Sequence, residues 1–399
     1  MGIVMKNKYT PTALALYFNY FVHGMGVIIL SQNAANLAHQ WGTTETGALA
    51  VVSSLGIGRI INLLASGVLS DKFGRKPFVQ LGIVTYFIFF VGILMSPNTV
   101  IAYILGILAG MANSFLDTGT YPGLMEIYPN SKGTSNVVLK AFISAGQFFL
   151  PFIVSFLAAA HMWYGWSFLI PATILVLTFL YFMFGGAFPD SNSTNKTVEE
   201  KITDNNVKTN LWLDGTLFII YGYISQATFY LVSQMLTQYG QKIGNLSQVT
   251  AHSLVSWYSL GSIICVLTTA VLGKKFSEIQ FVPIYTLGAF ISLALMWLYP
   301  TNASLMIILS ILVGFFAAGG VMQLALTVMA EFFPAGKGTV TGFFYTAGSI
   351  ASFTIPLAIN WIGNMRNVML FDVIIALIGF IDTSMIAMRY KKMFGKLGK

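Results

Sequence analysis

The sequence carries very little charge. Lys, Arg, Asp and Glu together make up 9% of its 399 residues, whereas about a quarter of the residues in a typical soluble domain are charged. A soluble fold needs a polar exterior, so this deficit excludes a soluble protein. Cysteine is also scarce. Cys265 is the only one in the sequence, which excludes a disulfide framework.

Signatures of catalysis are missing as well. The sequence has no HExxH zinc motif, no GxSxG nucleophile turn and no GxxxxGK[ST] phosphate loop. We therefore expect no catalytic residues, no bound metal and no cofactor, and we expect that the protein is not an enzyme. Because no nucleotide-binding loop is present, transport would be driven by an ion gradient or by the gradient of the solute itself.

Basic residues exceed acidic ones, and the net charge is +8. Nucleic-acid binding would need these cations on one soluble face, but they lie in short segments between apolar runs, so no nucleic acid is expected. The mean hydropathy is +0.75, and runs of about 20 apolar residues, long enough to cross the hydrocarbon core, predict an all-α membrane protein. We predict twelve transmembrane helices, near residues 9–35, 43–70, 78–97, 100–127, 134–160, 165–187, 211–238, 249–273, 280–299, 303–331, 338–361 and 367–389.

One long polar segment, from Asp190 to Asn210, interrupts the apolar runs. It predicts a six-helix bundle at 1–187, a linker at 188–210 and a second six-helix bundle at 211–399. Loops rich in Lys and Arg alternate along the chain with loops that carry little charge. Loops with an excess of positive charge are cytoplasmic. We therefore expect a multi-pass protein of the cell membrane with the linker and both termini in the cytoplasm.

A gapless internal repeat supports two related halves. The run EIYPNSKGT, which begins at Glu126, matches the run EFFPAGKGT, which begins at Glu331. In the same register Ser144 falls on Ser349, and the tripeptide Ser54-Leu55-Gly56 falls on Ser259-Leu260-Gly261. This register relates spans 2, 4 and 5 to spans 8, 10 and 11.

The loop between the second and third predicted helices reads GVLSDKFGRKP, from Gly67 to Pro77. It matches the signature G-x-L-a-D-[RK]-x-G-[RK]-[RK] of the major facilitator superfamily, which the chain resembles over its whole length. The resemblance implies a monomer with two pseudo-symmetric six-helix halves that carries a small solute by alternating access. Runs that begin at Leu16, Ser53 and Gly110 are similar to those of bacterial inner-membrane permeases sometimes suspected of handling quinate- or shikimate-like acids.

The resemblance also implies a gating role for this loop. The loop residues concerned are Gly67, Asp71, Gly74, Arg75 and Lys76. Gly74 permits a positive φ in a tight turn, and Glu126 and Glu331, at the cytoplasmic ends of spans 4 and 10, are placed to accept the loop cations. The alternatives are that the loop charges only fix the topology and that the two glutamates are solvated helix ends.

Two charged residues lie deep in predicted spans. Arg59 is about 16 Å from the cytoplasmic end of span 2 at 1.5 Å per residue, where a guanidinium needs an anion, carbonyls or a wet cavity. We favour substrate binding over a purely structural ion pair. Asp117 lies similarly deep in span 4 and is the candidate proton-coupling residue; sequence alone leaves open whether the two side chains touch. Asp372 and Asp382, in span 12, are expected to be structural.

Further polar side chains follow helical spacing and are candidates for substrate binding. In the first half these are Asn19, His23, Asn113, Tyr121 and Gln147, and in the second half Gln226, Tyr230, Gln234, Gln323 and Tyr345. Aromatic walls with a few polar groups suit a small ring-bearing or polyhydroxy solute. Packing within the bundle is the alternative role for most of these residues.

The favoured hypothesis is proton-coupled uptake of a small organic anion, such as a hydroaromatic or aromatic acid, by a secondary active transporter. The alternative is proton-antiport efflux of lipophilic or drug-like compounds. Uptake is favoured because residues 102–110 lack the basic residue that drug antiporters usually have there, and because a fixed Arg with few carboxylates suits an anion. A membrane sensor would need a sizeable soluble domain, for which the linker and tail are too short. The expected partners are the lipid bilayer, an anionic solute and a proton.

Overall fold

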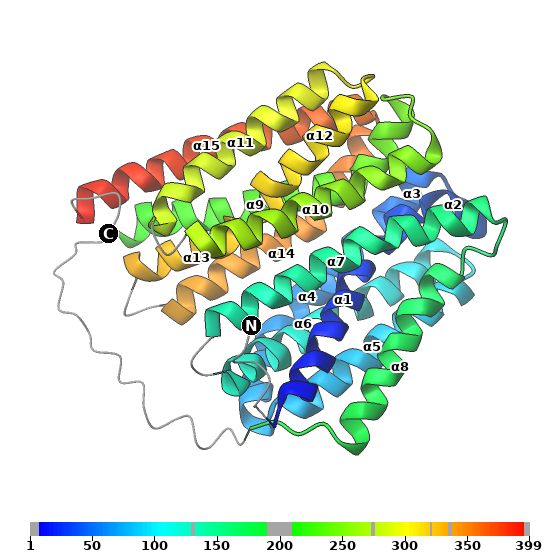
Figure 1. Ribbon diagram of the computed structural model, residues 1–399, viewed down its shortest axis with the longest axis horizontal. Coiled ribbons are helices and arrows are strands. Elements are labelled where there is room, and N and C mark those ends of the chain that lie inside the picture. Colours follow the sequence, from blue (N-terminus) through cyan, green and yellow to red (C-terminus); the bar gives the residue numbers. More distant parts are fainter. Residues whose placement is uncertain are drawn as a thin grey trace. The chain divides into compact units, whose positions relative to one another are not determined.

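The computed structural model describes residues 8–128, 132–189, 210–272, 276–319, 321–333 and 337–394 (Figure 1). The chain divides into two compact units, residues 1–200 and 201–399, and each unit is described by itself. Most of the predicted linker, residues 190–209, lies outside the described residues. The boundaries 1–187, 188–210 and 211–399 therefore stay predictions.

The N-terminal unit contains the first six predicted spans. Its helices are α1 (Thr10–Gln32), α2 (Ala34–Trp41), α3 (Glu45–Ala50), α4 (Ser53–Phe73), α5 (Arg75–Met95), α6 (Thr99–Ile127), α7 (Lys132–Ala159) and α8 (Trp166–Phe184). The second predicted span, 43–70, is divided into α3 and α4. Side-chain oxygens cap the helices where the chain turns: Thr44 accepts from the Gly47 amide before α3, and Asn98 accepts from the Ile101 amide before α6.

The C-terminal unit contains the other six spans. Its helices are α9 (Leu211–Lys242), α10 (Gln248–Leu272), α11 (Glu278–Leu298), α12 (Ala303–Val313), the π-helix η3 (Gly314–Ala318), α13 (Val321–Phe332), α14 (Lys337–Ile362) and α15 (Met365–Phe394). The tenth predicted span, 303–331, is not one continuous helix, because it passes through α12, η3 and α13.

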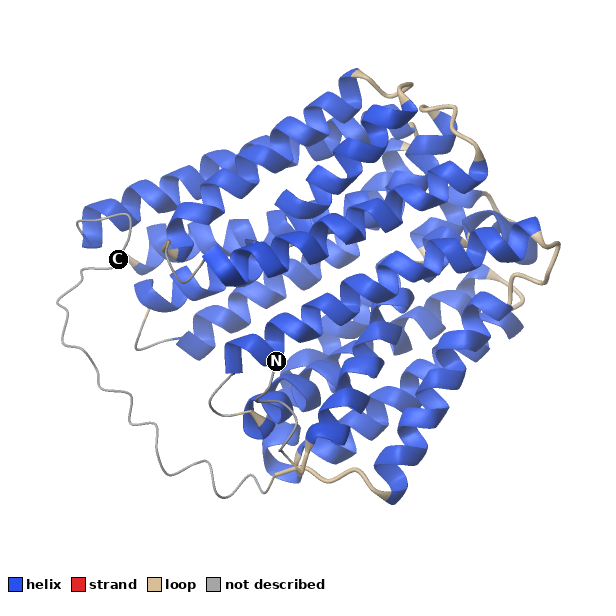
Figure 2. Ribbon diagram, in the orientation of Figure 1, coloured by secondary structure: helices blue, strands red, loops and turns tan. Residues whose placement is uncertain are grey.

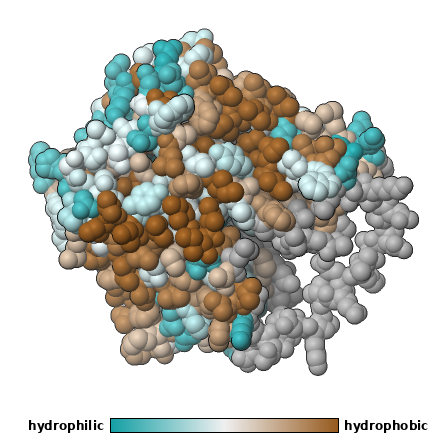
Figure 3. All heavy atoms as spheres, turned by 180° about the vertical axis from the view of Figure 1, so that it is seen from behind, coloured by the Kyte–Doolittle hydropathy of each residue, from teal (hydrophilic) through white to brown (hydrophobic). Residues whose placement is uncertain are grey.

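The part of the chain that the structure describes contains helices and loops and no strand (Figure 2). Ten of its helices are long and apolar enough to cross a membrane, and the two remaining spans are the interrupted one, α12 to α13, and α14. Large apolar side chains stay exposed on these helices, for example Leu177, Phe184 and Trp361, and brown hydrophobic residues cover much of the face in Figure 3. An exterior of this kind suits lipid, and the predicted all-α membrane fold is confirmed.

Equivalent helices pack together in the same way within each unit. α1 packs against α7 and α9 packs against α14; α4 packs against α6, and α10 packs against α12 and η3. α5 contacts α6 and α8, whereas α11 contacts α12, α13 and α15. The internal repeat of the sequence thus corresponds to a repeated pattern of helix packing.

Glycines bring α4 and α6 into backbone contact in the N-terminal unit. A Cβ atom at Gly58 would collide with the carbonyl oxygen of Ile107, and a Cβ atom at Gly110 would collide with the carbonyl oxygen of Leu55. Small residues allow this close approach of membrane helices. The contact fixes the level at which α4 side chains meet α6 side chains.

The matching contact in the C-terminal unit corrects the register of the repeat. A Cβ atom at Gly261 on α10 would collide with the carbonyl oxygen of Ile311 in α12, just as Gly58 abuts span 4. Gly261 is therefore the structural equivalent of Gly58. The prediction that it matches Gly56 is wrong. Gly56 and Gly58 are only two residues apart in the sequence, and only the contact between the helices distinguishes them.

The π-helix accounts for another change of register, in span 10. Gly314 makes the contact in span 10 that Gly110 makes in span 4, since its Cβ atom would collide with the backbone of α10. The segment from Gly314 to Glu331 in span 10 is one residue longer than the segment from Gly110 to Glu126 in span 4. A π-bulge accommodates one additional residue in a helical turn, so η3 (Gly314–Ala318) absorbs the insertion.

Candidate functional site

The centre of the N-terminal unit holds one carboxylate with two donors. Arg59 on α4 donates from Nη2 to Oδ2 of Asp117 on α6 over 3.0 Å, and Tyr20 on α1 donates from its hydroxyl to Oδ1 over 2.6 Å. The side chains of Arg59 and Asp117 keep 19% and 15% of their surface exposed. The two predicted charges therefore do touch, and each side chain keeps a small part of its surface exposed.

The backbone contact between α4 and α6 sets up this ion pair. A Cβ atom at Gly110 would lie 2.9 Å from the amide nitrogen of Arg59, and the Ser114 hydroxyl donates to the Arg59 carbonyl oxygen over 3.3 Å. Asp117 follows Gly110 by two helical turns on the same side of α6. The side chains of Arg59 and Asp117 therefore span only a short distance, which restricts the ways in which they can pair.

Aromatic rings extend the site from Tyr20. The ring of Tyr121, one turn after Asp117, packs edge-on against Tyr20 with 5.8 Å between centroids, and the His23 ring does so at 5.6 Å. His23 Nδ1 lies 3.1 Å from the Tyr86 hydroxyl on α5. The predicted residues Tyr121 and His23 thus belong to the same cluster as the ion pair, although His23 is buried.

Three other predicted residues of this unit lie differently. Asn19 is fully buried, and its Oδ1 accepts a 2.6 Å hydrogen bond from Thr178 on α8, so it faces the inside of the bundle. Gln147 on α7 is also buried, and its Nε2 has no hydrogen-bond partner among the described residues. Asn113 is half-buried one turn before Asp117. The Nδ2 atom of Asn19 has no hydrogen-bond partner among the described residues, and a role of Asn19 in substrate binding stays a prediction.

The predicted residues of the C-terminal unit are mostly buried. Gln226, Tyr230 and Gln234 on α9 are at most 9% exposed. Gln226 packs on α14, where a Cβ atom at Gly348 would lie 3.5 Å from it. Tyr345 on α14 is half-buried, and the side chain of Gln323 lies outside the described residues. The i, i+4, i+8 stripe of α9 is buried, and its first member, Gln226, packs on α14.

The loop signature forms a very short connection between α4 and α5. Gly74 alone separates the two helices, with φ +90°, a conformation that favours glycine. A Cβ atom at Gly67 would meet only Thr118, at 3.9 Å. The predicted tight turn at Gly74 is confirmed, while Lys76 is half-buried and the side chain of Asp71 lies outside the described residues.

Arg75 ties this loop to α6. Its Nε donates to Oε1 of Glu126 over 3.1 Å, and its Nη1 donates to the Ser70 hydroxyl over 3.1 Å. Ser70 in turn donates to the Thr118 carbonyl oxygen over 2.9 Å. Glu126 therefore accepts a loop cation, as the sequence predicts, while the gating role of the pair stays a prediction.

The C-terminal unit uses different partners at the corresponding end. Glu331 accepts a 2.6 Å hydrogen bond from the Tyr390 hydroxyl. Arg389 binds Asp214 with two hydrogen bonds of 2.7 and 2.9 Å, which join α15 to α9. Sequence reasoning missed the Arg389–Asp214 pair, and it also missed Tyr20. The signal for Tyr20 was its i, i+3 spacing from His23, which places both rings on one face of α1.

The described residues contain no group of three or more His, Cys, Asp or Glu side chains that could hold a metal ion. The site brings together a guanidinium, a carboxylate and a phenol hydroxyl, which form an ion pair and two hydrogen bonds.

Comparison with known proteins identifies the family. The family model described as Major Facilitator Superfamily matches residues 16–356 and, in a second match, residues 215–392. The chain is 48% identical over 391 residues to the inner membrane transport protein YdiM of Escherichia coli (strain K12), covering 97% of this chain and 96% of that protein. The chain belongs to the Major Facilitator Superfamily.

Other relatives agree with this membership. YdiN, an inner membrane transport protein of the same organism, is 36% identical and covers 96% of this chain and 92% of its own length. YfkL of Bacillus subtilis (strain 168), an MFS-type transporter, is 37% identical and covers 98% of this chain and 99% of its own length. This superfamily protein is therefore a multi-pass membrane transporter and not an enzyme.

A solved structure supports the fold. The crystal structure of a D-xylose-proton symporter matches with a TM-score of 0.76 over 95% of this chain and 97% of that chain, at 16% sequence identity. The predicted fold with twelve spans and two halves is confirmed. Identity this low carries the fold alone, so the substrate has to be argued from the residues of this chain.

Proposed function

We propose that this transporter takes up a small organic anion together with a proton, by alternating access. The observation that carries the proposal is the hydrogen-bonded pair of Arg59 and Asp117, with 3.0 Å between Nη2 and Oδ2. A hydroaromatic or aromatic acid is the proposed substrate class, because a cation and several aromatic rings surround the same point.

The ion pair supplies a physical reason for coupling. While Asp117 is ionised, its charge compensates the guanidinium of Arg59, and an anion gains little by approaching. Once Asp117 accepts a proton, Arg59 keeps its charge and can bind a carboxylate in two-pronged geometry. Proton and anion therefore bind more tightly together than either binds alone, and the coupling is reciprocal.

Tyr20 gives the same carboxylate a second donor. Its 2.6 Å hydrogen bond to Oδ1 holds Asp117 in place when the Arg59 side chain turns to the substrate. Tyr20 and Tyr121 also offer ring faces and edges to a cyclic solute. In this proposal Arg59 binds the anion, Asp117 binds the proton, and Tyr20 and Tyr121 shape the site.

A binding screen on the purified protein tests the proposal, because ligands stabilise the state that they bind. Hydroaromatic acids, other organic acids, sugars and lipophilic cations are added singly, and the melting temperature is recorded for the wild type, for Arg59→Ala and for Arg366→Ala as an arginine control outside the site. We expect an organic acid to stabilise the wild type and Arg366→Ala but not Arg59→Ala. Stabilisation by lipophilic cations only, unchanged in Arg59→Ala, would replace the proposal with proton-antiport efflux.

A further inference from the structure

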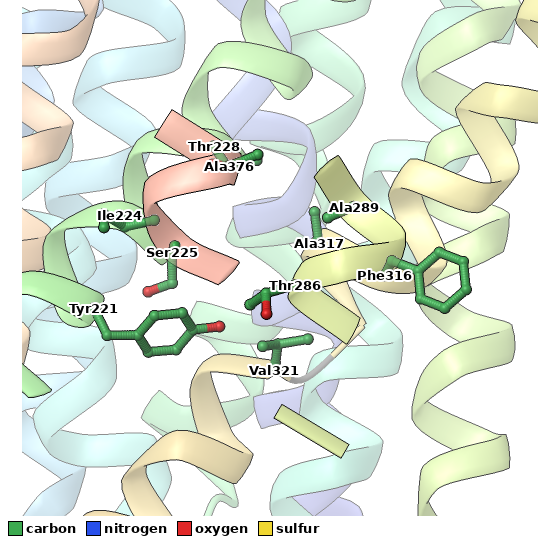
Figure 4. Close-up of a pocket in the computed structure, with 11 residues that line it drawn as sticks. Tyr221, Ile224, Ser225, Thr228, Thr286, Ala289, Phe316, Ala317, Val321 and Ala376 are labelled. Atoms are coloured by element: carbon green, nitrogen blue, oxygen red, sulfur yellow. The ribbon is translucent and has the colours of Figure 1, made fainter. Parts of the chain in front are cut away.

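A small cavity lies within the C-terminal unit, beside the π-helix of span 10 (Figure 4). Its walls come from α9, α11, α13, α15 and η3. Several wall residues are small, which leaves the space between the helices open: Ala289, Ala317, Ala376 and Gly379. The cavity has a volume of about 20 Å³, and a water molecule needs about 10–15 Å³. The space is therefore large enough for a water and too small for a solute with a ring.

Hydroxyl groups line this cavity, and none of the described residues in its wall is charged. The hydroxyls belong to Tyr221, Ser225 and Thr228 on α9 and to Thr286 on α11. Cavities with apolar walls stay dry, whereas a polar cavity of sufficient size can bind water. A buried ion would need an opposite charge beside it. The walls thus suit one neutral molecule that forms hydrogen bonds.

Tyr221 contributes a hydroxyl that can donate into the cavity. Its side chain is 2% exposed, and the hydroxyl makes no hydrogen bond with another of the described residues. In Figure 4 this hydroxyl points toward Thr286. A tyrosine hydroxyl that is buried usually has a hydrogen-bond partner, because a buried donor without one is unfavourable. The cavity is where such a partner fits.

Thr286 contributes an acceptor on the opposite wall. Its side chain is 7% exposed. Its hydroxyl oxygen lies 2.7 Å from the Thr383 hydroxyl on α15 and 3.1 Å from the Val282 carbonyl oxygen. These contacts use the single proton of the Thr286 hydroxyl and at most one of its two lone pairs. One lone pair is therefore left for a donor in the cavity, and a water between two polar groups can bridge them.

We propose that this cavity binds one water molecule, which accepts a hydrogen bond from the Tyr221 hydroxyl and donates one to the Thr286 hydroxyl oxygen. Ser225, whose hydroxyl donates to the Gly222 carbonyl oxygen over 3.2 Å, offers its oxygen as an acceptor for the second proton of the water. Three hydrogen bonds are typical of a buried water. The water joins α9 to α11 beside the interruption of span 10, and the site does not depend on the proposed transport site.

Hydroxyl-radical footprinting of the purified full-length protein tests this water site. A short X-ray pulse converts water to hydroxyl radicals, which oxidise neighbouring side chains, and mass spectrometry gives the oxidation rate of each residue. Tyr221 and Tyr239 are a matched pair, because both lie on α9 and are 2% and 1% exposed. The Tyr239 hydroxyl donates to the Met296 carbonyl oxygen over 3.1 Å and does not line the cavity. We expect Tyr221 to be oxidised several-fold faster than Tyr239.

Thr286→Val removes the proposed acceptor with little change of shape, so the oxidation rate of Tyr221 should fall to that of Tyr239. Thr268→Val is the control, because the Thr268 hydroxyl donates to the Ile264 carbonyl oxygen of its own helix over 2.8 Å. This variant should leave the rate of Tyr221 unchanged.

Two results would overturn the water site. Equal oxidation rates of Tyr221 and Tyr239 in the wild type would mean that no water is bound beside Tyr221. A fast rate that Thr286→Val leaves unchanged would mean that bulk solvent, and not a bound water, reaches Tyr221. Should Thr286→Val fail to fold, Ala376→Val fills the cavity and should lower the rate of Tyr221 in the same way. An unchanged rate in Ala376→Val contradicts the proposal.

Discussion

Arg59 and Asp117 meet across the backbone contact of α4 and α6, with 3.0 Å between Nη2 of the guanidinium and Oδ2 of the carboxylate. The pair is asymmetric between the units, because the C-terminal unit places no arginine at the equivalent depth. We expect Asp117→Asn to abolish accumulation driven by a pH gradient while sparing counterflow exchange of the same substrate, measured in proteoliposomes. If both activities survive, Asp117 has no part in coupling.

The stability of the bundle should report the same ion pair. Arg59→Met leaves an ionised carboxylate without its cation, and breaking a buried pair in this way costs about 3–5 kcal/mol. The double variant Arg59→Met with Asp117→Asn removes both charges and should recover most of that loss. Chemical unfolding of the two variants measures the difference. Equal stability of the single and double variants would mean that the pair is solvated in the native state.

Removal of the Tyr20 hydroxyl tests the second donor to Asp117. A hydrogen bond to a charged group is worth about 1.5–3 kcal/mol, so Tyr20→Phe should lower stability by that order. It should also move the pH profile of transport, because Asp117 loses a donor that favours its ionised form. Tyr86→Phe, which removes the contact with His23 instead, is the matched control and should leave the pH profile unchanged.

Two glycines of α4 should respond differently to the same substitution. Gly58→Ala forces a Cβ atom into the Ile107 carbonyl oxygen, whereas Gly67→Ala places its Cβ atom 3.9 Å from Thr118. We expect Gly58→Ala to destabilise the protein by about 1–3 kcal/mol, as overpacking does, and Gly67→Ala to leave the melting temperature nearly unchanged. A loss of transport in the stable Gly67→Ala protein would support its predicted gating role.

The Arg75–Glu126 pair offers a test of gating at the loop. Arg75→Gln and Glu126→Gln should each slow transport without loss of folded protein, and the exchange variant Arg75→Glu with Glu126→Arg should restore part of the rate. Lys72→Gln is the control, because Lys72 is exposed and lies over the neighbouring Phe73 ring. Transport rates are measured at saturating substrate. If Lys72→Gln and Arg75→Gln slow transport equally, the charges of the loop serve only to fix the topology.

Much of the fold was predictable because each membrane span is a long run of apolar residues, which the composition of the sequence reveals directly. The loop motif predicted the turn at Gly74, and its positive φ follows from local sterics. The break of span 10 into α12, η3 and α13 was not predictable, because a one-residue insertion leaves hydropathy unchanged. In the sequence the insertion appears only as one additional residue between Gly314 and Glu331. It can be recognised only after the structure shows that Gly314 is a packing glycine.

The candidate site was predictable in part. Charge at mid-span singled out Arg59 and Asp117, since a charged side chain in a bilayer needs a counter-charge or a wet cavity. Helical spacing found Tyr121 and His23 but also selected Asn19, whose side chain is directed to Thr178. A helix face is wide enough to contact two neighbouring helices, and periodicity does not distinguish them. The structural role expected for Asp372 stays a prediction; its carboxylate is buried, and neither oxygen has a hydrogen-bond partner among the described residues.

The single-residue connection at Gly74 has a mechanical consequence. It joins two helices of 21 residues each, and two peptide links, each of about 3.8 Å between successive Cα atoms, leave little slack. The end of α4 cannot slide along its axis without pulling the start of α5 with it. We therefore expect the end of α4 and the start of α5 to stay together at Gly74 during transport, while the angle between the two helices can change there.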